Sequence, residues 1–240
     1  MHWSCINGYK KHNNRKHADK PTLRFGLPVL RALCIFPENG ESMKKLLLTL
    51  PFALVACASN PVDPNIPANV TLSEPEAYNA RYIESVKFDL ESTHLNGNPG
   101  KCLALIVDNK EYTLSDSSSS FVGGYTGNYY NIEKQRQVGG GQSLIYSDEK
   151  SAISKGSTEG TFTFGMVPIT KIVTFKVEVN TTEGKRGINF TDVRAAQKST
   201  GAASNDGFNR VGAWSGAKPV FVYDLLKKVS NEIKSCLSAG

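Results

Sequence analysis

The sequence predicts a mainly β fold, an antiparallel sheet or a β-sandwich with one C-terminal amphipathic helix packed on it. Three observations carry this prediction. Strand-like segments recur from residue 81 onward, and the clearest of them, residues 171–181, alternates apolar and polar side chains. Segments rich in glycine, serine and asparagine separate these strands. After Pro219 the apolar residues recur at spacings of three and four, which is typical of a helix with one apolar face.

The first predicted strand lies within residues 82–91, where Val86, Phe88 and Leu90 form one apolar face. A hairpin is predicted next, in the segment KCLALIVDNKEYTL. Its residues Cys102–Val107 are continuously apolar, as in a strand covered on both faces, and a turn at Asp-Asn-Lys leads into a returning strand.

A long glycine- and tyrosine-rich segment follows the serine run that ends this hairpin. It contains at least one strand, QSLIY. The pattern does not fix where other strands in this segment begin and end. The segments 160–169 and 171–181 are each predicted as strands, and residues 183–218 as a long loop with one short strand near residues 188–193. The apolar face of the final helix consists of Val222, Leu225, Leu226, Val229, Ile233, Cys236 and Leu237.

An apolar leader stands inside the chain, at residues 43–57. Met43 and two lysines precede ten apolar residues, and Ala56 and Cys57 follow them. This order is that of a secretory signal peptide, and the run is too short to span a bilayer. The ending Leu-Val-Ala-Cys resembles the lipobox of bacterial lipoproteins. The resemblance implies that Cys57 is acylated, and that Ala58, which follows where the family has Asp for retention, directs the protein to the outer membrane.

This resemblance divides the chain into four parts. Residues 1–42 are interpreted as untranslated sequence read in frame ahead of a true start at Met43, the alternative being a long positively charged leader. Residues 43–56 form the signal peptide. Residues 57–80 contain four prolines and are predicted as an extended tether, and residues 81–240 form a single β-rich domain.

The charge of the chain disfavours nucleic acid as a partner. The full sequence has 28 Lys and Arg against 22 Asp and Glu, but nine of the basic residues and only three of the acidic ones precede Cys57. The 184 residues from Cys57 onward therefore have no net charge. Phosphate binding needs a basic face on the folded domain, so the basic pI is no evidence for it.

The cysteine count predicts a disulfide. If Cys57 carries lipid, Cys102 and Cys236 remain as an even pair in an oxidising compartment. Cys236 lies on the apolar face of the last helix, and Cys102 begins the strand expected to be covered on both faces. The alternative is two separate buried thiols.

No catalytic residue, metal site or cofactor is predicted. The segment after Cys57 contains one histidine, His94, in a Gly/Asn/Pro turn, too few for a common zinc site. There is no G-x-S-x-G motif and no phosphate-binding glycine loop. The carboxylate pairs Asp89/Glu91 and Asp148/Glu149 are interpreted as solvated charges on strands or turns.

Two features remain as candidates for binding. Tyr125, Tyr129 and Tyr130 lie among glycines, where flat aromatic faces with polar edges could contact sugar or protein, although strand tyrosines are an ordinary alternative. Trp214, in the later loop, is expected to dock into the domain, and it is also included as a possible part of this surface. Basic residues gather in the same later loop (Lys185, Arg186, Arg194, Lys198 and Arg210) and could meet anionic polymer or lipid, or simply be solvated.

The sequence thus predicts a protein anchored to the outer membrane by lipid on Cys57, facing the periplasm or the cell surface. Its expected role is non-catalytic binding or scaffolding, with another envelope protein or a glycan as partner. The alternative is an envelope hydrolase that acts on glycan or peptide through carboxylates that the pattern does not identify.

Overall fold

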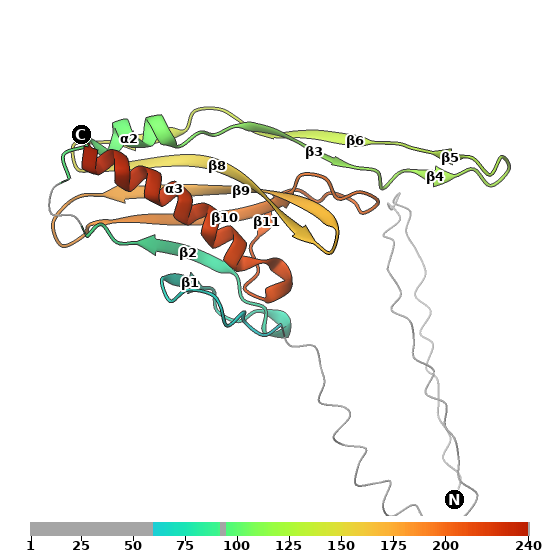
Figure 1. Ribbon diagram of the computed structural model, residues 1–240, viewed down its shortest axis with the longest axis horizontal. Coiled ribbons are helices and arrows are strands. Elements are labelled where there is room, and N and C mark those ends of the chain that lie inside the picture. The colour runs from blue at the N-terminus through green and yellow to red at the C-terminus, as the bar shows by residue number, and fades with distance from the viewer. Residues whose placement is uncertain (1–59, 92–94, 240) are drawn as a thin grey trace, which may run out of the picture. The chain divides into compact units, whose positions relative to one another are not determined.

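A seven-stranded antiparallel sheet with a long helix across one face forms the centre of the domain (Figure 1). The computed structural model describes residues 60–91 and 95–239, which belong to one compact unit. The strand order is β1-β2-β10-β9-β8-β7, with β11 paired to β10. The sheet strands are β1 (Val70–Leu72), β2 (Ile83–Phe88), β7 (Leu144–Ser147), β8 (Ser151–Phe164), β9 (Val167–Asn180), β10 (Gly187–Gln197) and β11 (Asn209–Arg210). The mainly β fold class is therefore confirmed.

The remaining elements are two strand pairs and short helical segments. β3 (Glu111–Asp116) pairs with β6 (Lys134–Gly139), and β4 (Phe121–Val122) pairs with β5 (Tyr129–Tyr130). The helices are η2 (Ala77–Asn79), α2 (Pro99–Ile106), η3 (Ser215–Ala217) and α3 (Pro219–Ala239).

The two longest strands, β8 and β9, form one hairpin. Residues 160–169, predicted as a single strand, are instead the end of β8, a two-residue loop and the start of β9. Gly165 has φ +61°, which suits the first position of such a loop. The alternation predicted for β9 is confirmed, since Phe175, Val177 and Val179 are buried and Lys176 is exposed.

β10 corrects the prediction of a long loop at residues 183–218. It runs for 11 residues between β2 and β9, and Ile188 and Phe190 are completely buried. The register shifts between Thr191 and Arg194, and Asp192 has φ +48°. Such a bulge interrupts the period of two, which explains why the pattern indicated only a short strand.

The segment predicted as a buried strand, Cys102–Val107, is instead the end of helix α2 and, at Val107, its C-cap, so that prediction is wrong. Asn98 caps the helix by accepting a hydrogen bond from the Lys101 amide (3.0 Å), and Pro99 occupies its first turn. A short apolar run fits a buried strand or a buried helix equally well, and here the cap decides. The expected returning strand exists as β3, but it pairs with β6.

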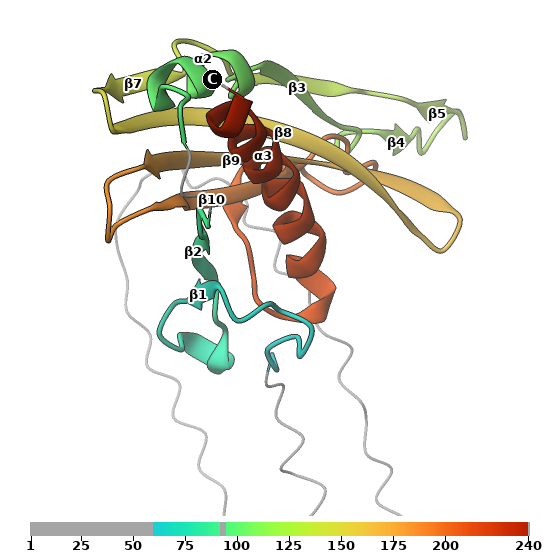
Figure 2. The ribbon, with the colours of Figure 1, turned by 60° about the vertical axis from the view of Figure 1, so that its left-hand side comes forward.

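Helix α3 follows the predicted apolar face. Val222, Leu226, Ile233 and Leu237 are completely buried, and Figure 2 shows the helix lying across the sheet. Gly160 of β8 permits this close packing, because a Cβ there would lie 2.8 Å from the Leu225 side chain.

The predicted Cys102–Cys236 disulfide is present, with 5.7 Å between the two Cα atoms. This separation is within the ordinary range for a disulfide. Because Cys102 lies in α2, the bond joins two helices rather than a strand and a helix. It closes a sequence separation of 134 residues.

The folded domain begins before residue 81, within the segment predicted as a tether. β1 pairs with β2, and the Asp63 amide donates to the Ala213 carbonyl (2.7 Å). Asp63 is itself buried. The predictions for residues 1–42, the signal peptide, Cys57 and His94 concern positions outside the described residues.

Candidate functional site

An ordered hairpin with exposed aromatic side chains projects from the domain. We call residues 121–130, comprising β4, β5 and the turn between them, the aromatic arm. Figure 1 shows it continuing the β3–β6 ribbon beyond the edge of the central sheet. Tyr125 is fully exposed, and the other large apolar side chains are between 43 and 64% exposed: Phe121, Val122, Tyr129 and Tyr130.

The base of the arm is fixed by the β3–β6 ribbon. Tyr112 and Leu114 of β3 are buried against Ile172 of β9 and Ala196 of β10. At the end of β3, the Asp116 carboxylate accepts hydrogen bonds from the hydroxyl and amide of Ser118 and from the Asn205 amide. These bonds favour the charged form and hold the pKa of Asp116 below its usual value.

The arm is also held by contacts of its own. The rings of Phe121 and Tyr130 stack with centroids 5.1 Å apart and an interplanar angle of 19°. The Gly123 amide donates to the Asn128 carbonyl (2.8 Å), and Gly127 has φ +68°. A two-stranded hairpin is marginally stable alone, and exposed aromatic faces are typical of surfaces that bind a partner.

The structure brings the three predicted tyrosines together but not Trp214. Trp214 packs edge-on against Tyr82, with ring centroids 5.7 Å apart. Its ring also lies 2.3 Å from the position that a Cβ of Gly212 would take. The Trp214 ring thus packs beside Tyr82, the residue before β2, and the contacts of this ring are with residues outside the arm.

Asp148, a candidate carboxylate, caps a turn. It accepts hydrogen bonds from the amides of Lys150 (2.8 Å) and Ser151 (2.6 Å) and from the hydroxyls of Tyr146 (2.7 Å) and Ser151 (2.9 Å). These bonds, that from Tyr146 first, lower the pKa of Asp148 to about 2. Its oxygens thus hold the β7–β8 connection together. In the part of the chain that the structure describes, no three His, Cys, Asp or Glu residues gather as metal ligands.

Four of the five basic residues of the predicted cluster have partners of their own, although Arg194 and Arg210 lie opposite each other on β10 and β11. Arg194 pairs with Asp192 (2.8 Å), Lys198 with Glu159 (3.3 Å), and Arg210 with Glu76. The Arg210 guanidinium also lies over the Tyr82 ring, and Arg186 donates to the Thr181 carbonyl. These residues do not converge on one anion site.

A second exposed apolar feature escaped the sequence reasoning. Phe164, Met166 and Val167 at the β8–β9 turn are 66, 98 and 62% exposed. We call these residues the β8–β9 tip. Next to the tip lies a groove of about 450 Å³, the lysine groove, lined by Phe162, Phe164, Ile169, Lys171, Gln197, Ser215, Gly216 and Lys218. Three apolar residues around one glycine, at positions 164–167, were the available signal for the tip.

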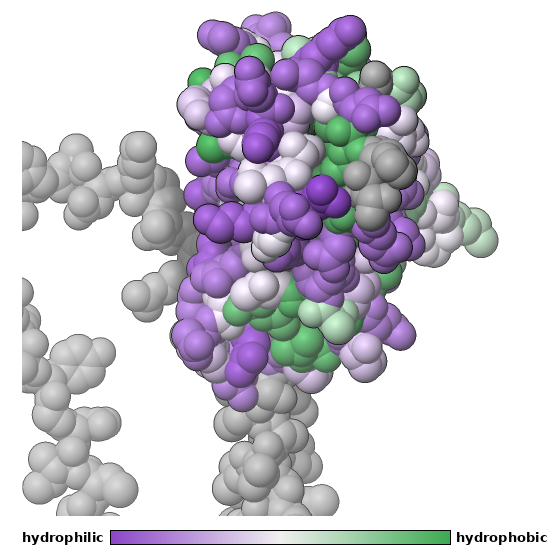
Figure 3. Space-filling model, turned by 90° about the vertical axis from the view of Figure 1, so that its left-hand side faces the viewer, coloured by the Kyte–Doolittle hydropathy of each residue, from purple (hydrophilic) through white to green (hydrophobic). Residues whose placement is uncertain are grey.

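Both the aromatic arm and the β8–β9 tip extend toward the same end of the domain in Figures 1 and 2. Figure 3 shows the opposite end, which is covered mostly by hydrophilic residues with smaller hydrophobic patches between them. Exposed apolar side chains occur elsewhere as well, such as Leu105 on α2 and Ile145 on β7, but within residues 60–91 and 95–239 the arm and the tip are the two places where several of them adjoin in one hairpin.

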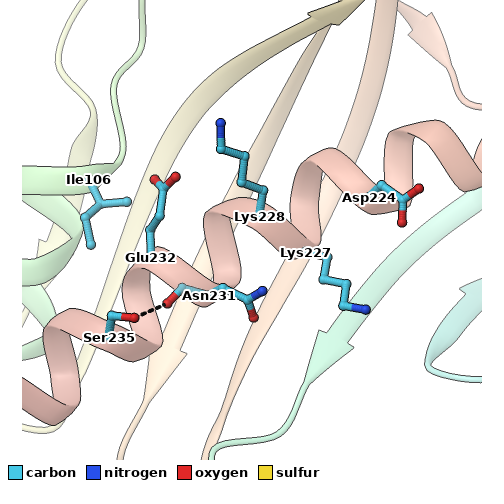
Figure 4. A pocket seen from close by; sticks show the side chains of 7 residues that line it. All are labelled: Ile106, Asp224, Lys227, Lys228, Asn231, Glu232 and Ser235. Atoms are coloured by element: carbon cyan, nitrogen blue, oxygen red, sulfur yellow. Dashed lines mark hydrogen bonds between the residues drawn. The ribbon is translucent and has the colours of Figure 1, made fainter. Parts of the chain in front are cut away.

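Another hollow, of about 590 Å³, follows the outer side of α3 (Figure 4). Six of its seven lining residues belong to that helix, and only Ile106 comes from another element. Lys227, Lys228, Asp224 and Glu232 carry both signs of charge along it. The hydrogen bond drawn there, from the Ser235 hydroxyl to the Asn231 carbonyl (2.9 Å), is internal to the helix. This is a solvated helix face without convergent polar groups.

Comparisons with known proteins complete the description of the site. Among the described residues, no helix combines the length and the hydrophobicity needed to cross a membrane. No family model matches the chain, and neither a curated protein nor a solved structure does.

Proposed function

We propose that the chain is a lipid-anchored bacterial envelope protein with a non-catalytic role, which binds another envelope component through the aromatic arm. The arm is the observation that carries this proposal: an ordered hairpin presents Tyr125, Tyr129 and a stacked Phe121–Tyr130 pair to solvent. Tyrosine and phenylalanine supply large contact area at low conformational cost, and they are enriched in interfaces.

The anchor is inferred from the lipobox-like ending at Cys57. A disulfide between Cys102 and Cys236 supports the extracytoplasmic location, because such bonds persist in oxidising compartments. The arm projects beyond the edge of the central sheet (Figure 1), so it offers a surface with which an anchored domain can contact a second component. Protein and cell-wall glycan both offer the apolar faces that stack on tyrosine.

The first prediction concerns the anchor. Mass spectrometry of the protein isolated from its native envelope should find Cys57 as the N-terminal residue, carrying acyl groups. Peptides from residues 1–42 in the same cells would contradict a start at Met43. A native form without lipid on Cys57 would contradict the anchor itself.

The second prediction concerns the arm. A photocrosslinking amino acid at Tyr125 should capture one discrete partner in intact envelopes, and the change Tyr129→Ala should lower the yield roughly tenfold or more, because central interface aromatics often contribute 2 kcal/mol or more. Glu183, exposed near the opposite end of β9, provides the matched control position.

The outcome discriminates between partners as well. An adduct that shrinks on digestion with a glycan hydrolase identifies cell-wall glycan, and one that keeps its size and yields peptides of a second sequence in mass spectrometry identifies protein. Equal capture from Tyr125 and Glu183, or no capture at Tyr125, would contradict the arm as the binding surface. Circular dichroism of Tyr129→Ala should match the unchanged protein, since Tyr129 is 64% exposed.

A further inference from the structure

The β8–β9 tip combines exposure with a defined backbone. Phe164 pairs with Val167 across a two-residue loop of Gly165 and Met166. Met166 is 98% exposed, so its side chain contacts almost nothing in the domain. The three apolar side chains of this protruding turn are exposed to water. This exposure is unfavourable unless another surface covers them.

The lysine groove shares Phe164 with this tip, and its lining residues carry a net positive charge. Lys171 and Lys218 line it, and none of its eight lining residues is Asp or Glu. The Lys171 ammonium donates to the Ala217 carbonyl (2.7 Å) and lies 5.7 Å from the centre of the Phe162 ring. Neither lysine takes part in a salt bridge among the described residues.

Burial, followed by the nearby charge of Lys218, lowers the pKa of Lys171. Both causes disfavour the second positive charge in the groove, and an anion bound between the two lysines would oppose the repulsion. Asp63 is the carboxylate nearest to Lys218: hydrogen bonds from Asn65 and Ser215 and the charge of Lys218 all favour its ionised form, so it offsets part of the charge of Lys218. Asp63 does not line the groove, and Lys171 has no carboxylate partner among the described residues, so Lys171 is the lysine that an anion in the groove would neutralise.

The beginning of the domain lies beside the same groove. Asp63 contacts Ser215, which lines the groove, and its amide bonds to Ala213. Cys57 stands six residues before Asp63, and six residues extend over at most about 20 Å. A lipid on Cys57 would thus hold the bilayer surface within reach of the groove and the tip.

We propose that the β8–β9 tip and the lysine groove form a second membrane contact, in which Phe164, Met166 and Val167 enter the headgroup region and Lys171 and Lys218 bind the phosphate of an anionic phospholipid. The orientation rests on the proposed anchor at Cys57. Apolar side chains flanked by lysines are the combination that binds anionic bilayer surfaces, whereas a soluble anion would leave the tip uncovered.

The test uses the intact lipoprotein carrying an environment-sensitive dye at the change Met166→Cys, with vesicles of phosphatidylcholine alone or mixed with phosphatidylglycerol. Dye emission should shift to shorter wavelength with the anionic vesicles and return at high ionic strength. A dye at Glu183→Cys, which follows β9 at the end opposite to the tip, should show no shift that depends on phosphatidylglycerol. Lys171→Gln and Lys218→Gln should each lower the equilibrium constant for tip insertion about fivefold.

The failure of the anchor and the failure of this surface give different results. Protein that does not float with vesicles of phosphatidylcholine alone contradicts acylation of Cys57. With lipid in excess, the Met166 dye still reports the affinity of the tip in that case. Unchanged emission of this dye on anionic vesicles overturns the membrane contact, whether or not the protein floats. This comparison uses protein in which both lysines are unchanged. Misfolding of a lysine variant would therefore not affect it.

Discussion

Removal of the Cys102–Cys236 disulfide should lower the free energy of unfolding by about 5 kcal/mol, the chain-entropy value for a loop of this length. The suitable variant carries Cys102→Ala and Cys236→Ala together, because Cys102 is buried and serine would leave a hydroxyl there without a partner. Urea denaturation at neutral pH measures the loss.

The position of the bond predicts where the effect appears first. α2 and α3 pack on each other, and α3 also covers β2, β8 and β10. Without the bond, the amides of α3 should exchange with solvent sooner than those of β8 and β9, which are paired along 14 residues each. Treatment of the unchanged protein with reductant should reproduce this pattern, and reductant should leave the double variant unaffected. Equal stability of the oxidised protein and the double variant would contradict the prediction.

The periodic elements were the ones that the sequence could predict. α3 obeys spacings of three and four over 21 residues. Four residues of the expected apolar face, Val222, Leu226, Ile233 and Leu237, are completely buried, and Ser230 is buried with them. β9 obeys strict alternation over its second half because one side faces α3 and the core and the other faces solvent. The cysteine pair was found by counting, independently of which element carries Cys102.

The errors have local physical causes. In residues 102–107 every side chain is apolar, so no period distinguishes helix from strand, and only the Asn98–Pro99 cap indicated the helix. In β10 the left-handed backbone of Asp192 breaks the alternation after Thr191. β1 was obscured by the surrounding prolines, which resemble those of a tether.

The candidate surfaces were only partly visible in the sequence. The tyrosines of the arm are close together in the chain, so their grouping was predictable. The lysine groove instead combines Phe162, Lys171 and Lys218, which come from β8, β9 and the residue preceding α3. Their proximity depends on where α3 begins over the sheet, and Phe221 of α3 packs on Phe162 with ring centroids 4.9 Å apart. Spacing in the chain contains no information about that contact.

The second large effect is expected at Phe190, at the centre of the main core. Its side chain is completely buried on β10, and its ring lies edge-on to Phe175 (centroids 5.1 Å apart) and Phe88 (5.9 Å). Phe190→Ala should lower the free energy of unfolding by about 3–5 kcal/mol, because it leaves a cavity and removes both aromatic contacts.

Phe121→Ala provides the matched control, since it is the same change at a ring that is 52% exposed on the arm. Its free energy of unfolding should stay within about 0.5 kcal/mol of the unchanged protein, apart from the contribution of the stacked Tyr130 ring. The order of the two effects should reverse when the yield of photocrosslinking from Tyr125 is measured in intact envelopes. Phe121→Ala should lower this yield directly, whereas Phe190→Ala should lower it only through unfolding. Comparable losses of stability in the two variants would contradict both the central position of Phe190 and the exposure of the arm.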